Sequence, residues 1–361
     1  MDFRLTDEQE FIRDTLRKFI ARECRRDMAR ALDEQASFPV NLLRKLAETG
    51  FCGLNNPEEY GGGGRNLLGA VLVVEDLAAI YPALAGAFSR IALCGGKIIS
   101  ELGSHDQKRE WLPGVADGSL LFTSAIDDDT TEATAVREAE AFILNGAKAH
   151  VPLARHATHI LTLAGTSLFV VEAASPGIQI EEIEQVGYRG ANPGRVTFEN
   201  VRIPVDHSLG NQYRYLQAVE QIEAAALGLG IAQGAYDYAA KYARERVQFG
   251  QPISQFEAIQ HMLVDMAIEI RSARLLLYQA CWLADQGQPF ALEAAMAKAR
   301  AVELARNASL RGLHILGGYG FMMEYDAQRY VRDALALLAG SEPVETLKNQ
   351  VGELLGLGVM A

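Results

Sequence analysis

The repeat of the hydrophobic residues changes twice along the chain, and this change limits the possible folds more than any other feature. Between residues 256 and 284, apolar side chains recur at steps of three and four. Such a stripe predicts one long helix with a single face packed against neighbouring helices. Segments 214–244 and 290–314 have a similar pattern, so the last part of the chain is predicted to be a helical bundle.

From about residue 119 to 206, short runs rich in β-branched and aromatic residues replace the helical repeat. The predicted strands are Leu120–Ser124, Ala141–Leu144, His159–Leu163, Leu168–Val171, Ile178–Ile180 and Val196–Val201. Asn145-Gly146 and Ala191–Gly194 have the composition of turns. Because no helical segment separates these runs, they predict a small antiparallel sandwich or barrel.

The first third of the chain has a helical pattern. Thr6 and Gln9 have the spacing of a capping box, and apolar-rich segments follow at 67–80 and 86–102. The predicted order is therefore helical, then β, then helical.

Charge and cysteine usage exclude several classes of protein. The chain has 34 Lys and Arg against 46 Asp and Glu, a net charge of −12, whereas a general nucleic-acid binder or a protein of anionic membranes needs a basic surface. No run reaches the roughly 18 to 20 apolar residues of a membrane span, and the first residues lack the pattern of a secretory signal. The four cysteines lack the spacing of a zinc site, so no metal is predicted. These observations favour a soluble, cytoplasmic protein.

Two stretches near the C-terminus carry candidate binding residues. At a predicted helix end closed by Gly250, Arg246 and Phe249 lie three residues apart, which on a helix puts a guanidinium and an aromatic ring on one side. That pair suits an anionic ligand with a flat ring, although Arg and Gly are also ordinary residues of a helix C-terminus. In the second stretch, His314–Gly320, paired glycines either permit close approach to a ligand or form a turn between helices.

Two other patterns have simpler interpretations. Gly228, Gly230 and Gly234 superficially match a dinucleotide fingerprint, but they lie inside a helical segment, so close helix packing is predicted. The run Asp127-Asp128-Asp129 lacks the spaced ligands of a calcium loop, so a solvated turn is predicted.

Several stretches, taken in order, resemble the acyl-CoA dehydrogenase family over nearly the whole chain. They are MDFRLTDEQEFIRDTLRKFI, NNPEEYGGGG, LGSHDQKREWLPGVADGSL, FILNGAKAHV, VTFENVRIP, ARERVQFGQPI and LHILGGYG. The resemblance implies an α+β multidomain fold. Its parts are an N-terminal helical domain (1–118), a middle antiparallel β domain (119–208) and a C-terminal four-helix bundle domain (209–361).

The resemblance also implies the chemistry and the cofactor. In this family a carboxylate removes the α-proton of an acyl-CoA thioester while FAD accepts a hydride from the β-carbon. Members assemble as dimers or tetramers, and an electron-transfer flavoprotein accepts their electrons. FAD lies across a subunit interface, held by residues of the two C-terminal motifs, which here are Arg246, Phe249, Gly250, His314, Gly317 and Gly318. The family usually has Gln at the position of His314.

The usual catalytic base of the family is absent from this chain. The family has a Glu before Gly-Thr, shortly after an Arg-Asp pair, whereas here Arg332-Asp333 leads by a shorter segment to Ala339 and then Gly340-Ser341. Some members place the base on an earlier helix, at the position that is Glu220 here. Glu220 is therefore the predicted base, and the alternative is an exposed helical Glu without a catalytic role.

The residues that hold the flavin ring differ as well. A Thr that contacts the ring becomes Ala125, and the Trp-Ile-Thr beside the ring becomes His150-Val151-Pro152. Residues that reach into a neighbour's site are mostly present, whereas those of the chain's own site are mostly missing. This asymmetry predicts one subunit of a mixed α2β2 acyl-CoA dehydrogenase, similar to paired bacterial subunits of sterol side-chain degradation. The alternatives are a self-sufficient homo-oligomer that uses Glu220 and a non-catalytic scaffold that binds no flavin.

Overall fold

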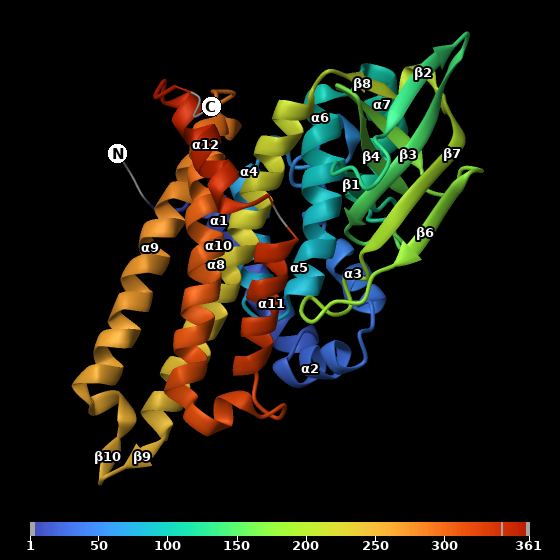
Figure 1. Ribbon diagram of the computed structural model, residues 1–361. Helices are drawn as coiled ribbons and strands as arrows, with labels where there is room; N and C mark the ends of the chain where they lie inside the picture. Colours follow the sequence, from blue (N-terminus) through green and yellow to red (C-terminus); the bar gives the residue numbers. More distant parts are fainter. Residues whose placement is uncertain (1–3, 341, 359–361) are drawn as a thin grey trace.

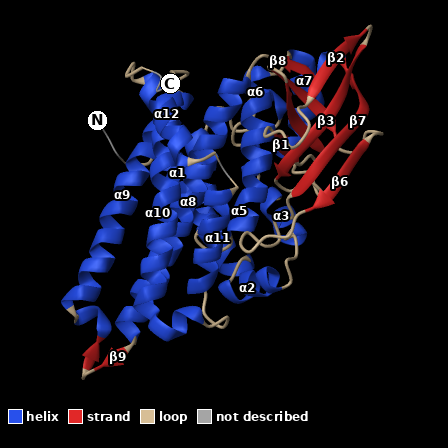
Figure 2. Cartoon of the chain, viewed as in Figure 1, coloured by secondary structure: helices blue, strands red, loops and turns tan. Residues whose placement is uncertain are grey.

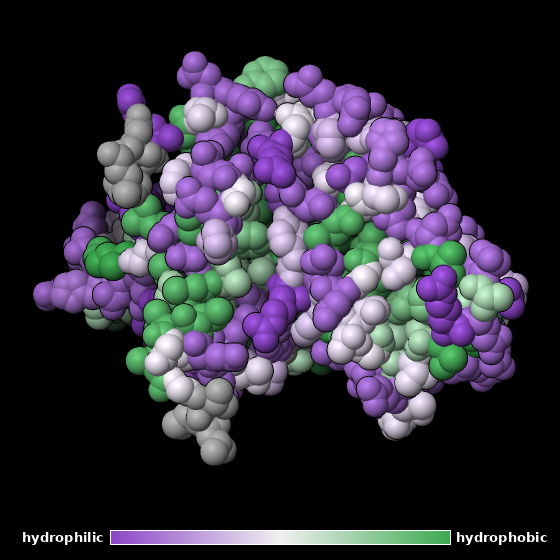
Figure 3. All heavy atoms as spheres, turned by 90° about the horizontal axis from the view of Figure 1, so that it is seen from above, coloured by the Kyte–Doolittle hydropathy of each residue, from purple (hydrophilic) through white to green (hydrophobic). Residues whose placement is uncertain are grey.

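The computed structural model describes residues 4–340 and 342–358. The strands of its middle part gather at one side of the molecule, against a larger body of helices, and one short hairpin lies at the opposite end (Figures 1 and 2). Seen from above, the surface is mostly hydrophilic with scattered apolar patches (Figure 3). The first seven helices are α1 (Asp7–Glu23), α2 (Arg26–Glu34), α3 (Val40–Ala47), α4 (Leu67–Ala78), α5 (Pro82–Ser89), α6 (Ile98–Leu102) and α7 (His105–Ala116).

The predicted capping box begins α1. The Gln9 backbone N–H donates to Thr6 Oγ1 at 3.3 Å, and the Thr6 N–H donates to Gln9 Oε1 at 3.0 Å. Two of the N–H groups that an α-helix leaves without intrahelical partners are thereby satisfied.

An apolar helical run joins α5 to α6 through a π-helical segment, Arg90–Lys97. Among the residues that the structure describes, this run (Pro82–Leu102) is the one helix long and apolar enough to cross a membrane, which the residue pattern alone did not predict. However, 83% of its apolar window is buried inside the molecule. Its apolar residues are therefore explained by burial in the helical core.

Two four-stranded sheets form the middle of the chain. Their strands are β1 (Phe122–Ala125), β2 (Thr134–Glu138), β3 (Ala141–Val151), β4 (His159–Ala164), β5 (Ser167–Glu172), β6 (Ile178–Glu182), β7 (Gly194–Pro204) and β8 (Ser208–Gly210). One sheet has the order β1-β4-β5-β8 and the other β2-β3-β7-β6. Their pairings are antiparallel apart from β1 with β4, which is parallel, with Phe122 opposite His159.

The strand prediction was wrong in two places. Strands β2 and β8 were missed, because β2 is mostly exposed and β8 has only three residues. Asn145-Gly146 forms no turn; it lies inside β3, where the register with β7 shifts at a bulge. Gly146 has φ +134°, and a Cβ there would lie 2.5 Å from Ala133 Cα, so the position requires glycine.

The acidic run after β1 is also more than a solvated turn. Asp128 Oδ1 lies 2.8 Å from Lys148 Nζ of β3, and Asp129 forms an ion pair with Arg195 of β7. These pairs fasten the loop to the sheet.

The C-terminal helices are α8 (Tyr213–Glu245), α9 (Glu257–Asp285), α10 (Ala291–Leu316), α11 (Ala327–Ala339) and α12 (Val344–Leu354). The first four pack on one another, as the bundle prediction requires (Figure 1). The predicted stripe of α9 is confirmed, with Met266, Ile270, Ala273, Leu277, Cys281 and Ala284 buried.

The three glycines of α8 mark close helix packing, as predicted. A Cβ at Gly230 would lie 2.4 Å from the Glu75 carbonyl of α4, and one at Gly234 would lie 2.3 Å from the Ala79 carbonyl. A Cβ at Gly228 would lie 2.8 Å from the Ala301 carbonyl of α10. Side chains at these positions would force the helices apart.

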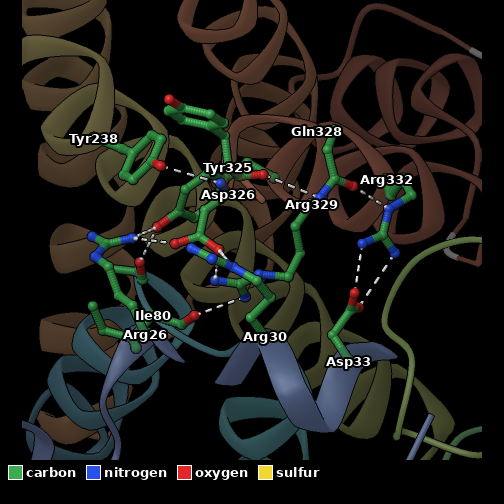
Figure 4. A network of polar contacts seen from close by, with 12 residues as sticks. Arg26, Arg30, Asp33, Ile80, Tyr238, Tyr325, Asp326, Gln328, Arg329 and Arg332 are labelled. Carbon is green, nitrogen blue, oxygen red and sulfur yellow. Dashed lines mark hydrogen bonds and ion pairs between the residues drawn. The ribbon is translucent and has the colours of Figure 1, made fainter. Parts of the chain in front are cut away.

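A network of ion pairs joins α2 to α11 (Figure 4). Arg332 Nη2 lies 2.5 Å from Asp33 Oδ2, and Arg30 Nε donates to Asp326 Oδ1 at 3.2 Å. Arg329 Nη1 donates to the Ile80 carbonyl at 2.8 Å. The network fixes the position of α11, whose last residues reach the cavity described next.

Candidate active site

A cavity lies where the β part meets the helices. Its larger outer lobe has a volume of about 450 Å³ and its inner lobe about 90 Å³. Both lobes are lined by Arg90, His150, Pro152, Glu223, Leu227, Leu337 and Gly340, so they form one continuous space. The walls come from the π-helical segment, β3, α8 and the end of α11.

Arg90 occupies the centre of the cavity wall. Its Nη1 donates to Glu220 Oε1 at 3.0 Å and to Ser124 Oγ at 2.6 Å, and its Nε lies 3.2 Å from Glu223 Oε1. The Ser124 hydroxyl also donates to Glu220 Oε1. Burial opposes the charge of Arg90, but the carboxylates of Glu223 and Glu220 outweigh it and raise the pKa of the guanidinium.

Local helix geometry aims Arg90 at this cluster. The residue begins the π-helical segment, in an otherwise apolar run, and its side chain is only 13% exposed. The wider turn of a π-helix changes the direction of the side chains that follow, and such segments are frequent at functional sites.

Glu223 ends in the inner lobe and is the most buried acid of the cluster, at 3% exposure. Its Oε1 accepts from Ser89 Oγ at 2.7 Å, whereas its Oε2 is buried without a hydrogen-bond partner among the described residues. Burial raises the pKa of Glu223, and Arg90 and Ser89 oppose that shift. The buried hydroxyl of Tyr188, in the same lobe, likewise lacks a partner.

The predicted base Glu220 is part of this site. Its side chain is 22% exposed and lines the outer lobe, so it is not the exposed glutamate of the alternative interpretation. The next residue, Gln221, contacts α12 and the segment before it: its Nε2 donates to Gln350 Oε1 of α12 at 2.7 Å and to Glu342 Oε2 at 3.2 Å.

The segment that carries the family's usual base also reaches the cavity. Gly340 lines both lobes, and a Cβ at this position would lie 3.4 Å from His150 Cε1. Ala339 precedes it and supplies no acid, and Ser341 lies outside the described residues. Glu220 and Glu223 are therefore the carboxylates that α8 brings to the cavity, Glu220 in the outer lobe and Glu223 in both lobes.

The candidate residues at the far end of α8 are arranged differently from the prediction. α8 ends at Glu245, and Gly250 does not close it. Instead β9 (Val247–Gln248) and β10 (Gln251–Pro252) form a hairpin. Phe249 and Gly250 are its turn, with φ values of +52° and +84°. Arg246 and Phe249 thus do not share a helical face.

This hairpin comes together with the glycine stretch at the end of α10. The Arg246 guanidinium lies over the Tyr319 ring, with Cζ 5.7 Å from the ring centroid. His314, Gly317 and Gly318 are exposed, and a Cβ on either glycine would meet nothing within 4 Å. Phe249 is 94% exposed. The two motifs therefore form one open surface.

This surface is far from the cavity. Glu220 and Arg246 are 26 residues apart on α8 and its C-cap, which corresponds to roughly 39 Å along a helix. Figure 1 shows the same separation, with the β9–β10 hairpin and the β sheets at opposite ends of the molecule. A single FAD cannot reach both places on one chain.

Comparison with known proteins identifies the family. Family models of acyl-CoA dehydrogenases match in the order expected, the N-terminal domain at residues 6–119, the middle domain at 124–201 and the C-terminal domain at 216–355. The chain belongs to the acyl-CoA dehydrogenase family. Members of this family are FAD-dependent oxidoreductases that dehydrogenate acyl-CoA.

Individual relatives align along nearly their whole length. The chain is 34% identical to a probable acyl-CoA dehydrogenase of Bacillus subtilis, covering 94% of this chain and 96% of the relative. It is 36% identical to the benzylmalonyl-CoA dehydrogenase of Aromatoleum aromaticum, covering 96% and 98%. The butyryl-CoA dehydrogenase structure of Megasphaera elsdenii superimposes with a TM-score of 0.93 at 27% identity, covering 98% of this chain and all of that one.

The acyl-CoA dehydrogenase cofactor fits one half of its site better than the other. The open surface with Arg246, Phe249 and Tyr319 offers a cation, aromatic rings and bare glycine backbone, which suit a diphosphate and an adenine. The cavity side offers His150 and Pro152, and its one hydroxyl from β1, on Ser124, is already bonded to Glu220. Ala125 faces the interior of the sheets. The Thr and the Trp-Ile-Thr that the family resemblance puts beside the ring are Ala125 and His150-Val151-Pro152 in this chain.

The sequence analysis did not assign three residues to this site: Arg90, Glu223 and Tyr188. Arg90 was detectable as a cation within a mostly apolar run, because a charge buried with such a run requires a partner. Glu223 lies one helical turn from Glu220 and therefore shares its face. No sequence pattern indicated Tyr188, because it lies in the irregular loop after β6, and only the path of that loop brings it to the cavity.

Proposed function

We propose that this chain acts in FAD-linked α,β-dehydrogenation of an acyl-CoA thioester as one subunit of a mixed α2β2 assembly. The partner would be a related chain that supplies the flavin-ring site. The observation that carries the proposal is the contrast between the two ends of α8. The exposed end keeps the residues suited to the nucleotide, whereas the cavity end lacks the ring-holding hydroxyls.

The exposed end gains a role in such an assembly. Arg246, Phe249 and the glycines at 317 and 318 cannot contact a flavin ring in the chain's own cavity, because that cavity is roughly 39 Å away along α8. Beside a partner, they would hold the diphosphate and adenine of an FAD whose ring lies in the partner's cavity. Bound FAD supplies the hydride acceptor, and an electron-transfer flavoprotein would take the electrons onward.

A second candidate is a homo-oligomeric dehydrogenase in which Glu220 is the base. The observation in its favour is that Glu220 lines the outer lobe beside Arg90 and Ser124. Both contacts are to Oε1, so Oε2 is the oxygen to which the α-proton would move. Arg90 and Ser124 would then position the carboxylate.

Flavin content distinguishes these candidates. The chain is purified alone and after co-expression with the related chain encoded beside it, and the FAD absorbance per chain is measured. The mixed assembly predicts a colourless protein alone and a yellow complex. A yellow, active protein alone would favour the homo-oligomer, and no flavin in either preparation would leave the non-catalytic scaffold.

Variants at the exposed end make the test more specific. Arg246→Ala in the co-expressed complex is expected to lower the flavin content, since it removes the cation proposed to face the diphosphate. Arg244→Ala is the matched control, because Arg244 is also exposed on the last turn of α8. Equal flavin content in both variants would count against the proposed nucleotide surface.

A further inference from the structure

The exposed guanidinium of Arg246 has no acidic partner. Among the residues that the structure describes, no carboxylate forms an ion pair with it, although its side chain lies in the open between the β9–β10 hairpin and the end of α10. By contrast, Arg90, Arg274 and Arg332 each pair with a buried carboxylate. The positive charge of Arg246 is therefore not neutralised within the chain.

An aromatic ring holds Arg246 instead. Its Cζ lies 5.7 Å from the centroid of the Tyr319 ring. Its backbone is fixed on both sides, because its N–H donates to the Tyr242 carbonyl and its carbonyl accepts from the Ile253 N–H, each at 2.8 Å. The face of a ring attracts a guanidinium without neutralising its charge, and it leaves the N–H groups at the edge free to donate to an anion.

The Tyr319 ring is itself held by two further tyrosines. Its centroid lies 5.2 Å from that of Tyr325 and 6.4 Å from that of Tyr242. Tyr242 lies near the end of α8, Tyr325 precedes α11, and Tyr319 belongs to the 3-10 turn Gly317–Phe321 after α10. The position of the ring under Arg246 is thus determined by contacts among three separate segments.

We propose that Tyr319 is a positioning residue, which holds the Arg246 guanidinium in place for the diphosphate of the FAD shared with the partner. That an FAD lies here rests on the proposed function; the hold of the ring on Arg246 rests on the geometry. Because the guanidinium is ordered before the ligand arrives, less conformational entropy is lost on binding. The more open ring of Phe249, 94% exposed, remains available to stack on the adenine.

The rate at which the co-expressed complex releases FAD tests this role without relying on turnover. The rate is measured from the rise in free-flavin fluorescence after dilution. Arg246→Ala should speed the release about tenfold or more, as loss of a hydrogen bond to a charged group does. Tyr319→Leu should speed it about two- to fivefold, the contribution of an exposed cation–π contact.

Two matched variants locate the effect in the ring. Tyr319→Phe keeps an aromatic face under Arg246 and should release FAD at the wild-type rate. Phe11→Leu removes an exposed ring on α1 and should also leave the rate unchanged. If Tyr319→Leu does not assemble with the partner, Tyr319→Met replaces it, because an unbranched apolar side chain likewise offers no ring.

A double variant separates positioning from direct contact. In the Arg246→Ala background, Tyr319→Leu should cause no further acceleration, because the ring acts through the guanidinium that is already absent. If the two effects multiply, Tyr319 contacts the ligand itself or supports the surface in general, and the positioning role is overturned.

The remaining outcomes distinguish this inference from the proposed function. If Tyr319→Leu releases FAD at the wild-type rate, or Tyr319→Phe releases it as fast as Tyr319→Leu, the positioning role is overturned while the shared FAD stands. If the co-expressed complex contains no FAD, the proposed function fails and the positioning role fails with it.

Discussion

Arg90 Nη1 donates to Glu220 Oε1 at 3.0 Å, joining residues 130 positions apart in the sequence. The contact joins the π-helical segment, which precedes the β strands in the sequence, to α8, which follows them. Because Arg90 also pairs with Glu223, one side chain contacts both carboxylates that α8 brings to the cavity. The position of the candidate base is therefore decided by a residue of the N-terminal part.

Glu220→Gln measures how much of the chemistry this chain carries. In the co-expressed complex we expect turnover to stay within about twofold, because the partner's cavity holds the reacting groups in the mixed assembly. Loss of a general base typically lowers the rate by about 10²- to 10⁴-fold. Glu110→Gln, on the exposed face of α7, is the control and should leave turnover unchanged. If Glu220→Gln lowers turnover by about 10²-fold or more and Glu110→Gln does not, the result would favour the homo-oligomer with Glu220 as base.

Arg90→Met should destabilise the fold by about 3 kcal/mol or more, because it leaves a buried carboxylate, Glu223, without its cation. Adding Glu223→Gln should recover much of the loss, since the uncompensated charge is then removed. Urea unfolding of the wild type and of the single and double variants measures their free energies of unfolding. Arg109→Met is the control, as its pair with Asp106 is exposed; equal losses for Arg90→Met and Arg109→Met would refute the argument.

Asp33→Asn tests the network that holds α11 (Figure 4). Asp33 is 3% exposed and Arg332 17%, so breaking the pair should cost about 3 kcal/mol of unfolding free energy. Asp27→Asn removes a similar pair with Arg25 that is fully exposed, and should have no measurable effect. Matching unfolding curves for both variants would show that the α2–α11 pair does not stabilise the fold.

Asp333 should make stability depend on pH. Burial raises its pKa to about 6, against the opposing effects of Arg329 and the Tyr188 N–H. The neutral Asp333 carboxyl therefore contributes fully to the free energy of unfolding at pH values below the unfolded-state pKa near 4. This contribution is lost as the pH rises through 6. Relative to the wild type, Asp333→Asn should gain about 2.4 kcal/mol of unfolding free energy between pH 4 and pH 7. Unfolding free energies measured at several pH values check this, and a pH-independent difference would contradict it.

The β9–β10 hairpin that follows α8 shows why part of the site could not be predicted. Arg246 and Phe249 were singled out by residue type, and the prediction that they share a helical face was wrong. The local pattern did not reveal that α8 ends at Glu245, because the following turn is stabilised by pairing of β9 with β10 and by contact of Arg246 with Tyr319. Such contacts between distant segments override a helical preference.

The hydrophobic repeats by themselves determined the helical, β and helical order of this protein, since burial of a stripe or an alternating face needs only local spacing. The family resemblance, rather than the hydrophobic pattern, made Glu220 the predicted base. Only the tertiary structure decided that Arg90 and Tyr188 join that base in one cavity. These three residues come from the π-helical segment, the loop after β6 and α8, and contacts among such distant segments depend on distance in space rather than on spacing in sequence.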